Sequence, residues 1–250
     1  MRRTLPALFL VSLLLLGGCD VFFTNVFEGL YDLKVPSSSE LQTLPLADLE
    51  RLAEDPDFFD ALAADPAKEQ AVLDNLAPQF SDGTADTPEE QRAAALYAEV
   101  LLRTSGADEI AAGLASFAAG DGFDELENGD IGAALADLFG DSLPTLAEVE
   151  DMVEALDRAW DAYAAIGAGL GTAPLDESLN AGDLAFNAAL AAALQGVTVT
   201  SGQSTAEYIL AAIHGDTTGF TAAFSDAALT GAAMDNLLSA AGFDPSDLGL

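Results

Sequence analysis

The residue types that most often carry chemistry are scarce in this chain, apart from the carboxylates. His214 is the only histidine and Cys19 the only cysteine, whereas 42 of the 250 residues are Asp or Glu. One imidazole excludes zinc sites with several histidines, and no GxSxG, GxGxxG, Walker A or SxxK pattern occurs. His214 ends the apolar run 209–213, where a cation complements the negative end of a helix. We therefore predict a structural role for His214, no catalytic residue and no enzymatic activity.

The densest group of carboxylates lies between residues 121 and 130. An EF-hand loop needs oxygen ligands at positions 1, 3 and 5 and glycine at position 6. Phe123 and Leu126 stand at positions 3 and 6 of this stretch, so the EF-hand pattern fails. The sequence favours a solvated loop and no cofactor; the alternative is a non-standard cation site formed by Asp121, Asp124, Glu127 and Asp130. In the loop interpretation Asp130 caps the next helix.

The first residues of the chain have the pattern of an export signal. Arg2 and Arg3 precede an apolar run, Leu5–Leu16. This run is shorter than the roughly 20 residues that a membrane-spanning helix needs, so it indicates a cleaved signal peptide and not a span. Small residues and a single cysteine follow it, at 17–19.

The sequence Leu16-Gly17-Gly18-Cys19 resembles the lipobox of bacterial lipoproteins. The resemblance implies cleavage before Cys19, acylation of that cysteine with palmitate-like chains, and attachment to the cell envelope without a transmembrane helix. Asp20 is similar to the signal that retains enterobacterial lipoproteins in the inner membrane, which implies the periplasmic face of that membrane. The resemblance covers the anchor alone and implies nothing about the mature body.

The charge of the chain excludes one large class of partners. The formal net charge is −34, and it becomes −36 when Arg2 and Arg3 leave with the signal peptide. Such a surface repels phosphate backbones, so we expect no nucleic-acid partner. Two interpretations remain for the acidity: a surface for cations or basic partners, or a halophile-like adaptation to high salt. The spread of acids along the whole chain favours the adaptation.

We predict three regions: a signal peptide at 1–18, a lipidated N-terminus and tether at 19–43, and a helical domain at 44–250. The stretch near 120–143 is where a further domain boundary would fall. Asp55, Asp65 and Thr87 each precede a proline, the arrangement of an N-cap followed by proline at the first helical position. The predicted helices are 45–54, 56–64, 66–77, 88–105, 108–119, 130–139, 144–167, 181–195, 204–214 and 218–240.

Two of these helices have informative patterns. In 144–167, apolar residues recur at spacings of three and four, and Glu154 and Arg158 are placed to form an i,i+4 ion pair. The helix 181–195 is apolar nearly all round and is predicted to be central. The β-branched run 197–200 supports only a loop or one paired edge. The predicted fold class is all-α, either an irregular multi-helix bundle or a degenerate helical-repeat (TPR-like) array.

The sequence leaves three functions open. The leading hypothesis is a lipid-anchored, non-enzymatic helical envelope protein that acts through protein–protein contacts or as an accessory to a transporter. The second is a small-ligand-binding lipoprotein with an apolar pocket beside helix 181–195. The third is an envelope hydrolase with paired carboxylates, although no pair stands out among 42 acids.

Overall fold

The computed structural model describes residues 35–107, 144–214, 216–224 and 227–243, and this part of the chain is mostly helical, as predicted. The helices of its N-terminal part are α2 (Ser38–Leu41), α3 (Leu46–Ala53), α4 (Pro56–Ala63), α5 (Pro66–Leu76), the 3₁₀ helix η1 (Ala77–Phe80) and α6 (Pro88–Thr104). Its C-terminal part contains α10 (Leu146–Gly169), α11 (Ala181–Gln195), β1 (Val197–Val199), α12 (Thr205–Ile213), β2 (Ala222–Phe224) and α13 (Ala232–Ala240). The helices predicted at 108–119 and 130–139 lie outside the described residues.

Local chemistry sets where several helices begin and end. The side chains of Asp55, Asp65 and Thr87 each accept a hydrogen bond from a backbone N–H two or three residues further on. These bonds satisfy donors that a helix start leaves unpaired, and they confirm the predicted caps of α4, α5 and α6. Gly106 and Gly242 follow α6 and α13 with φ of 75° and 84°, the left-handed conformation that favours glycine.

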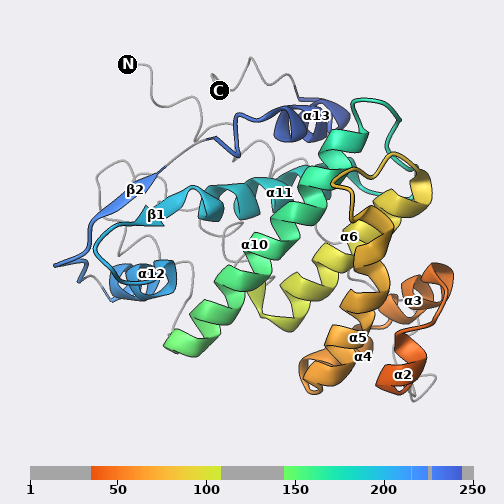
Figure 1. Cartoon of the computed structure of the whole chain (residues 1–250), viewed down its shortest axis with the longest axis horizontal. Coiled ribbons are helices and arrows are strands. Elements are labelled where there is room, and N and C mark those ends of the chain that lie inside the picture. The colour runs from red at the N-terminus through yellow and green to blue at the C-terminus, as the bar shows by residue number, and fades with distance from the viewer. Residues whose placement is uncertain (1–34, 108–143, 215, 225–226, 244–250) are drawn as a thin grey trace.

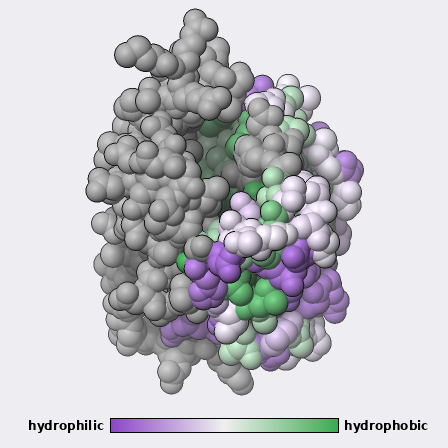
Figure 2. Space-filling view, turned by 90° about the vertical axis from the view of Figure 1, so that its left-hand side faces the viewer, coloured by the Kyte–Doolittle hydropathy of each residue, from purple (hydrophilic) through white to green (hydrophobic). Residues whose placement is uncertain are grey.

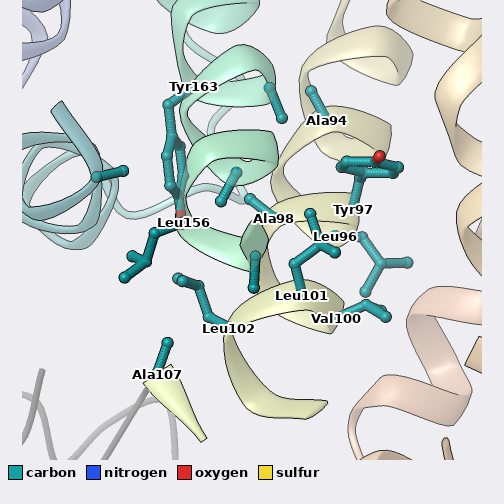
Figure 3. Close-up of a cluster of buried hydrophobic side chains, with 14 of the residues drawn as sticks. Ala94, Leu96, Tyr97, Ala98, Val100, Leu101, Leu102, Ala107, Leu156 and Tyr163 are labelled. Carbon is teal, nitrogen blue, oxygen red and sulfur yellow. The ribbon is translucent and has the colours of Figure 1, made fainter. Parts of the chain in front are cut away.

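Helix α10 is the element around which α6 and the C-terminal helices assemble, while α3, α4 and α5 pack against α6 (Figure 1). Helix α10 packs against α6, α11, α12 and α13. Its predicted apolar stripe is largely correct: Val149, Leu156 and Tyr163 are buried, and Trp160 packs against the core while partly exposed. Figure 3 shows the contact with α6, where leucines and alanines of α6 lie beside Leu156 and Tyr163.

Helix α11 is less enclosed than its sequence predicts. Leu184, Ala185 and Ala188 are buried, but Phe186 and Leu190 keep part of their surface exposed. The central position belongs to α10, which contacts α6 of the N-terminal part and three elements of the C-terminal part. The expectation failed because a composition rich in alanine makes a helix apolar on every side without determining how many sides find a partner.

Two glycines near the C-terminal end of α10 allow backbones to approach it closely. A Cβ atom at Gly169 would overlap the carbonyl of Ala85, and one at Gly167 would overlap the carbonyl of Ala233. The amide of Ala85 donates to the carbonyl of Ala165 at 2.9 Å, which fixes the loop before α6 against α10. Helix α10 ends at Gly169, two residues beyond its predicted end.

The predicted helix at 218–240 is wrong over its first half. Residues 222–224 form β2, which pairs antiparallel with β1, and only α13 remains helical. Gly219 has φ of 91°, which interrupts a helix, and the amide of Thr200 donates to the carbonyl of Thr221 at 2.8 Å. The β-branched run at 197–200 thus has its single partner strand.

The end of the predicted tether packs on the body. Leu41 of α2 is fully buried, and α2 lies against α5. The side-chain amide of Asn75 donates to the carbonyls of Leu41 and Leu44 at 2.8 and 2.9 Å. Residues 38–44 are therefore held by α5, and the rest of the tether up to residue 34 lies outside the described residues.

Candidate binding site

The feature that could bind a partner is an open hollow of about 410 Å³ between α10, the end of α11, β1 and the start of α12. We call it the α10–α12 groove. It is lined by Glu150, Val153, Glu154, Asp157, Gln195, Val197, Ser204, Thr205 and Ala206. Volumes of this order are common for small-ligand sites. In Figure 2, the described residues of the side that carries α12 and β2 include a hydrophobic patch bordered directly by hydrophilic residues.

Helix periodicity places the three carboxylates of the groove on one wall. Glu150, Glu154 and Asp157 follow one another at spacings of four and three, so they lie on one face of α10. Thr145 fixes the start of this helix through a capping box with Glu148. The opposite face of α10 is buried against the core, which prevents the helix from rotating and keeps the three carboxylates toward the groove.

The predicted ion pair between Glu154 and Arg158 is not formed. Instead, the guanidinium of Arg158 donates to the hydroxyl of Tyr97 on α6, at 2.9 Å from Nη2, and lies 5.7 Å from the centre of that ring. Tyr97 is buried, so this contact offers Arg158 a hydrogen bond and an aromatic face together, whereas an exposed i,i+4 pair contributes only about 0.3–0.5 kcal/mol. Arg158, the one basic residue of α10, therefore does not neutralise Glu150, Glu154 and Asp157, which we call the acidic row.

The acidic row is without a counter-charge in the described structure. No described Lys, Arg or His side chain lies within ion-pair distance of Glu150, Glu154 or Asp157. Asp157 accepts a hydrogen bond from the side-chain amide of Gln195 at 2.7 Å, which links α10 to the end of α11. Burial, and then the neighbouring charge of Asp157, raise the pKa of Asp161 one turn further along.

The second wall of the groove is the N-terminal end of α12. Ser204 Oγ accepts from the amide of Glu207 at 3.1 Å, and the Glu207 carboxylate accepts from the amide of Ser204 at 2.7 Å. This capping box uses donors of the helix start and adds a negative charge there. The net field in the groove is therefore set by carboxylates, and the ligand chemistry that complements it is cationic.

The other residues singled out in the sequence lie elsewhere. His214 is exposed and is the C-cap residue of α12, at the opposite end of that helix from the groove; its amide donates to the carbonyl of Leu210 at 3.1 Å. This is the helix end at which the sequence places His214, and its structural role stays a prediction. Cys19, Asp20 and the weak cation candidate of Asp121, Asp124, Glu127 and Asp130 fall outside the described residues. Within the residues that the structure does describe, no three His, Cys, Asp or Glu side chains are grouped to hold a metal ion.

A second hollow of about 380 Å³ lies at the other end of α10. It is lined by Leu170, Ala173, Pro174, Leu175, Asn236, Ser239 and Ala240. None of these side chains is ionisable, and the amide of Asn236 is occupied by a 2.8 Å hydrogen bond to the carbonyl of Gly167. These residues offer a ligand uncharged polar groups but no charge.

An ionisable cluster lies where α6, α10 and α11 meet. Tyr163 is buried, and burial followed by the charge of Glu99 raises the pKa of its hydroxyl above the ordinary value. Burial also raises the pKa of Glu99, an effect that Arg103 opposes from 3.5 Å along α6. Asp183 of α11 contributes a further negative charge toward Tyr163, and burial raises the pKa of Asp183 as well.

We expect Glu99 to make the stability of the protein fall as pH rises. A carboxyl whose pKa is raised on folding stabilises the fold most below its unfolded value, about 4.3, and this contribution is lost as pH rises through the folded pKa. In Glu99→Gln the free energy of unfolding should therefore decline less between pH 4 and pH 7 than in the parent, by urea titration. Glu177→Gln, in an exposed loop, is the control. Equal pH dependence in parent and Glu99→Gln would contradict this role.

Comparisons of the chain with family models, curated proteins and solved structures find no match. The class that the structure defines is therefore a mostly helical protein with an acid-lined groove, and its function has to be argued from that groove and from the N-terminal sequence.

Proposed function

We propose that this chain is a lipid-anchored, non-enzymatic protein of the bacterial cell envelope that binds a basic segment of a partner protein in the α10–α12 groove. One observation supports the groove as the binding site. Glu150, Glu154 and Asp157 lie on one wall of the groove, and no Lys, Arg or His of the described residues forms an ion pair with them. A lysine- or arginine-rich segment would supply the missing counter-charges, and Val153, Val197 and Ala206 would contact its aliphatic stems. A transporter subunit or another envelope protein is the expected kind of partner.

The anchoring half of the proposal rests on the resemblance of residues 16–19 to a lipobox. Two or more acyl chains on one cysteine give stable attachment, whereas one chain binds a membrane only marginally. Among the helices of the described residues, none is both long enough and apolar enough to cross a bilayer.

For the arrangement of the helices we propose an irregular bundle in preference to a degenerate repeat array. In a solenoid each repeat contacts only its neighbours in sequence. Here α10 contacts α6 before it and α11, α12 and α13 after it, and α11 also contacts α13. This pattern of contacts, gathered on one central helix, supports the bundle.

The groove is tested with a deca-lysine peptide at low salt, by calorimetry. The triple variant Glu150→Gln, Glu154→Gln, Asp157→Asn is expected to bind it about tenfold more weakly than the parent, because three exposed charge pairs at about 0.5 kcal/mol each are lost. The control triple Asp60→Asn, Glu89→Gln, Glu177→Gln removes the same charge from exposed positions outside the groove. It should bind almost as the parent does.

The control separates the groove from the net charge. If both triple variants weaken peptide binding equally, the affinity depends only on the overall charge of −36, and the groove is not a specific binding site. If neither variant weakens binding while both remain folded by circular dichroism, the carboxylates of the groove are not used at all.

The small-ligand alternative keeps one specific observation in its favour: the groove reaches Gln195 and Val197, at the end of the alanine-rich helix α11. Its lining is open and combines apolar side chains with three carboxylates, so the ligand class would be a small amine. Spermidine, titrated in parallel, distinguishes the two because a small-amine site should bind it as tightly as the peptide. The paired-carboxylate hydrolase gains no support from the groove, since its acids share one helix face and do not oppose each other across it.

The interpretation of the net negative charge as an adaptation to high salt has a separate test. We expect the chain from Val35 onward, which retains the buried Leu41, to melt several degrees higher in about 1 M KCl than at low salt, because screening relieves repulsion that is strongest in the folded state. Melting is followed by circular dichroism, with millimolar CaCl₂ as the comparison. A melting temperature that does not change with KCl would remove the high-salt interpretation. A saturable shift at millimolar calcium would indicate a specific site.

A further inference from the structure

We draw no further inference here: the strongest candidate, the acidic row of α10 facing the N-terminal end of α12, belongs to the groove already described, and nothing else in the described residues points to a ligand of a different kind there.

Discussion

Replacing Gly169 by alanine is expected to lower the free energy of unfolding by about 3 kcal/mol. In the middle of a helix this change would ordinarily stabilise by up to about 1 kcal/mol, because glycine is a poor helix former. At Gly169, however, the new methyl group would overlap the backbone carbonyl of Ala85, and that backbone is held to α10 by the 2.9 Å bond from Ala85 to Ala165. The steric cost exceeds the gain in helix propensity, since a backbone segment cannot move aside as a flexible side chain can.

The melting temperature should fall by roughly 6–12 °C for a domain of this size. Gly182→Ala is the matched control, because Gly182 lies in the first turn of α11 and its added Cβ would meet only the side-chain oxygen of Asn180, at 3.3 Å. That control should be neutral or slightly stabilised. A Gly169→Ala protein that melts with the parent would show that the loop before α6 is not packed on α10 as described.

The Cys19→Ser variant is expected to lose its lipid anchor. Without a thiol at the lipobox position no acyl chain can be attached, and the proposed anchor is lost. The protein should appear in the soluble fraction or accumulate as an unprocessed precursor, by fractionation and immunoblotting. Because Cys19 is the only cysteine, metabolic labelling with palmitate should disappear with it, and no other thiol can account for residual label.

Asp20→Ser is the control for this experiment and tests the leaflet separately. In an enterobacterial host it should keep the label and the membrane association and move the protein from the inner to the outer membrane. If Cys19→Ser still matures and sediments with membranes, the lipobox interpretation is wrong. If Asp20→Ser stays in the inner membrane, the anchor stands but the sorting interpretation does not.

The parts of the fold that were predictable from sequence are those determined within a few residues. Asp55, Asp65 and Thr87 cap helices through bonds to amides two or three residues away, so the starts of α4, α5 and α6 could be assigned from the chain alone. The helix predicted at 218–240 failed for the opposite reason: β2 depends on pairing with β1, about 25 residues earlier in the chain.

The groove could not be foreseen because its walls come from segments far apart in sequence. The row Glu150, Glu154 and Asp157 was visible as one polar face of a helix, but a polar helix face ordinarily lies in solvent. That Arg158 would turn to Tyr97 required knowing that α6 packs beside α10. The fully buried Gln91 is a similar case: its side chain bonds the carbonyl of Pro174 and the amide of Asp176, partners more than 80 positions away.

The two hydrogen bonds from the Asn75 side chain to the carbonyls of Leu41 and Leu44 have a mechanical consequence. Under the anchoring proposed at Cys19, the chain between Cys19 and Val35 spans at most about 55 Å, and the first described helix, α2, is held to α5 by Asn75 and by the burial of Leu41. In Figure 1, α2 and α12 lie toward opposite ends of the long axis of the molecule. Under the proposed anchoring, the described body is attached at the end that carries α2, and the α10–α12 groove lies toward the opposite end, away from the attachment.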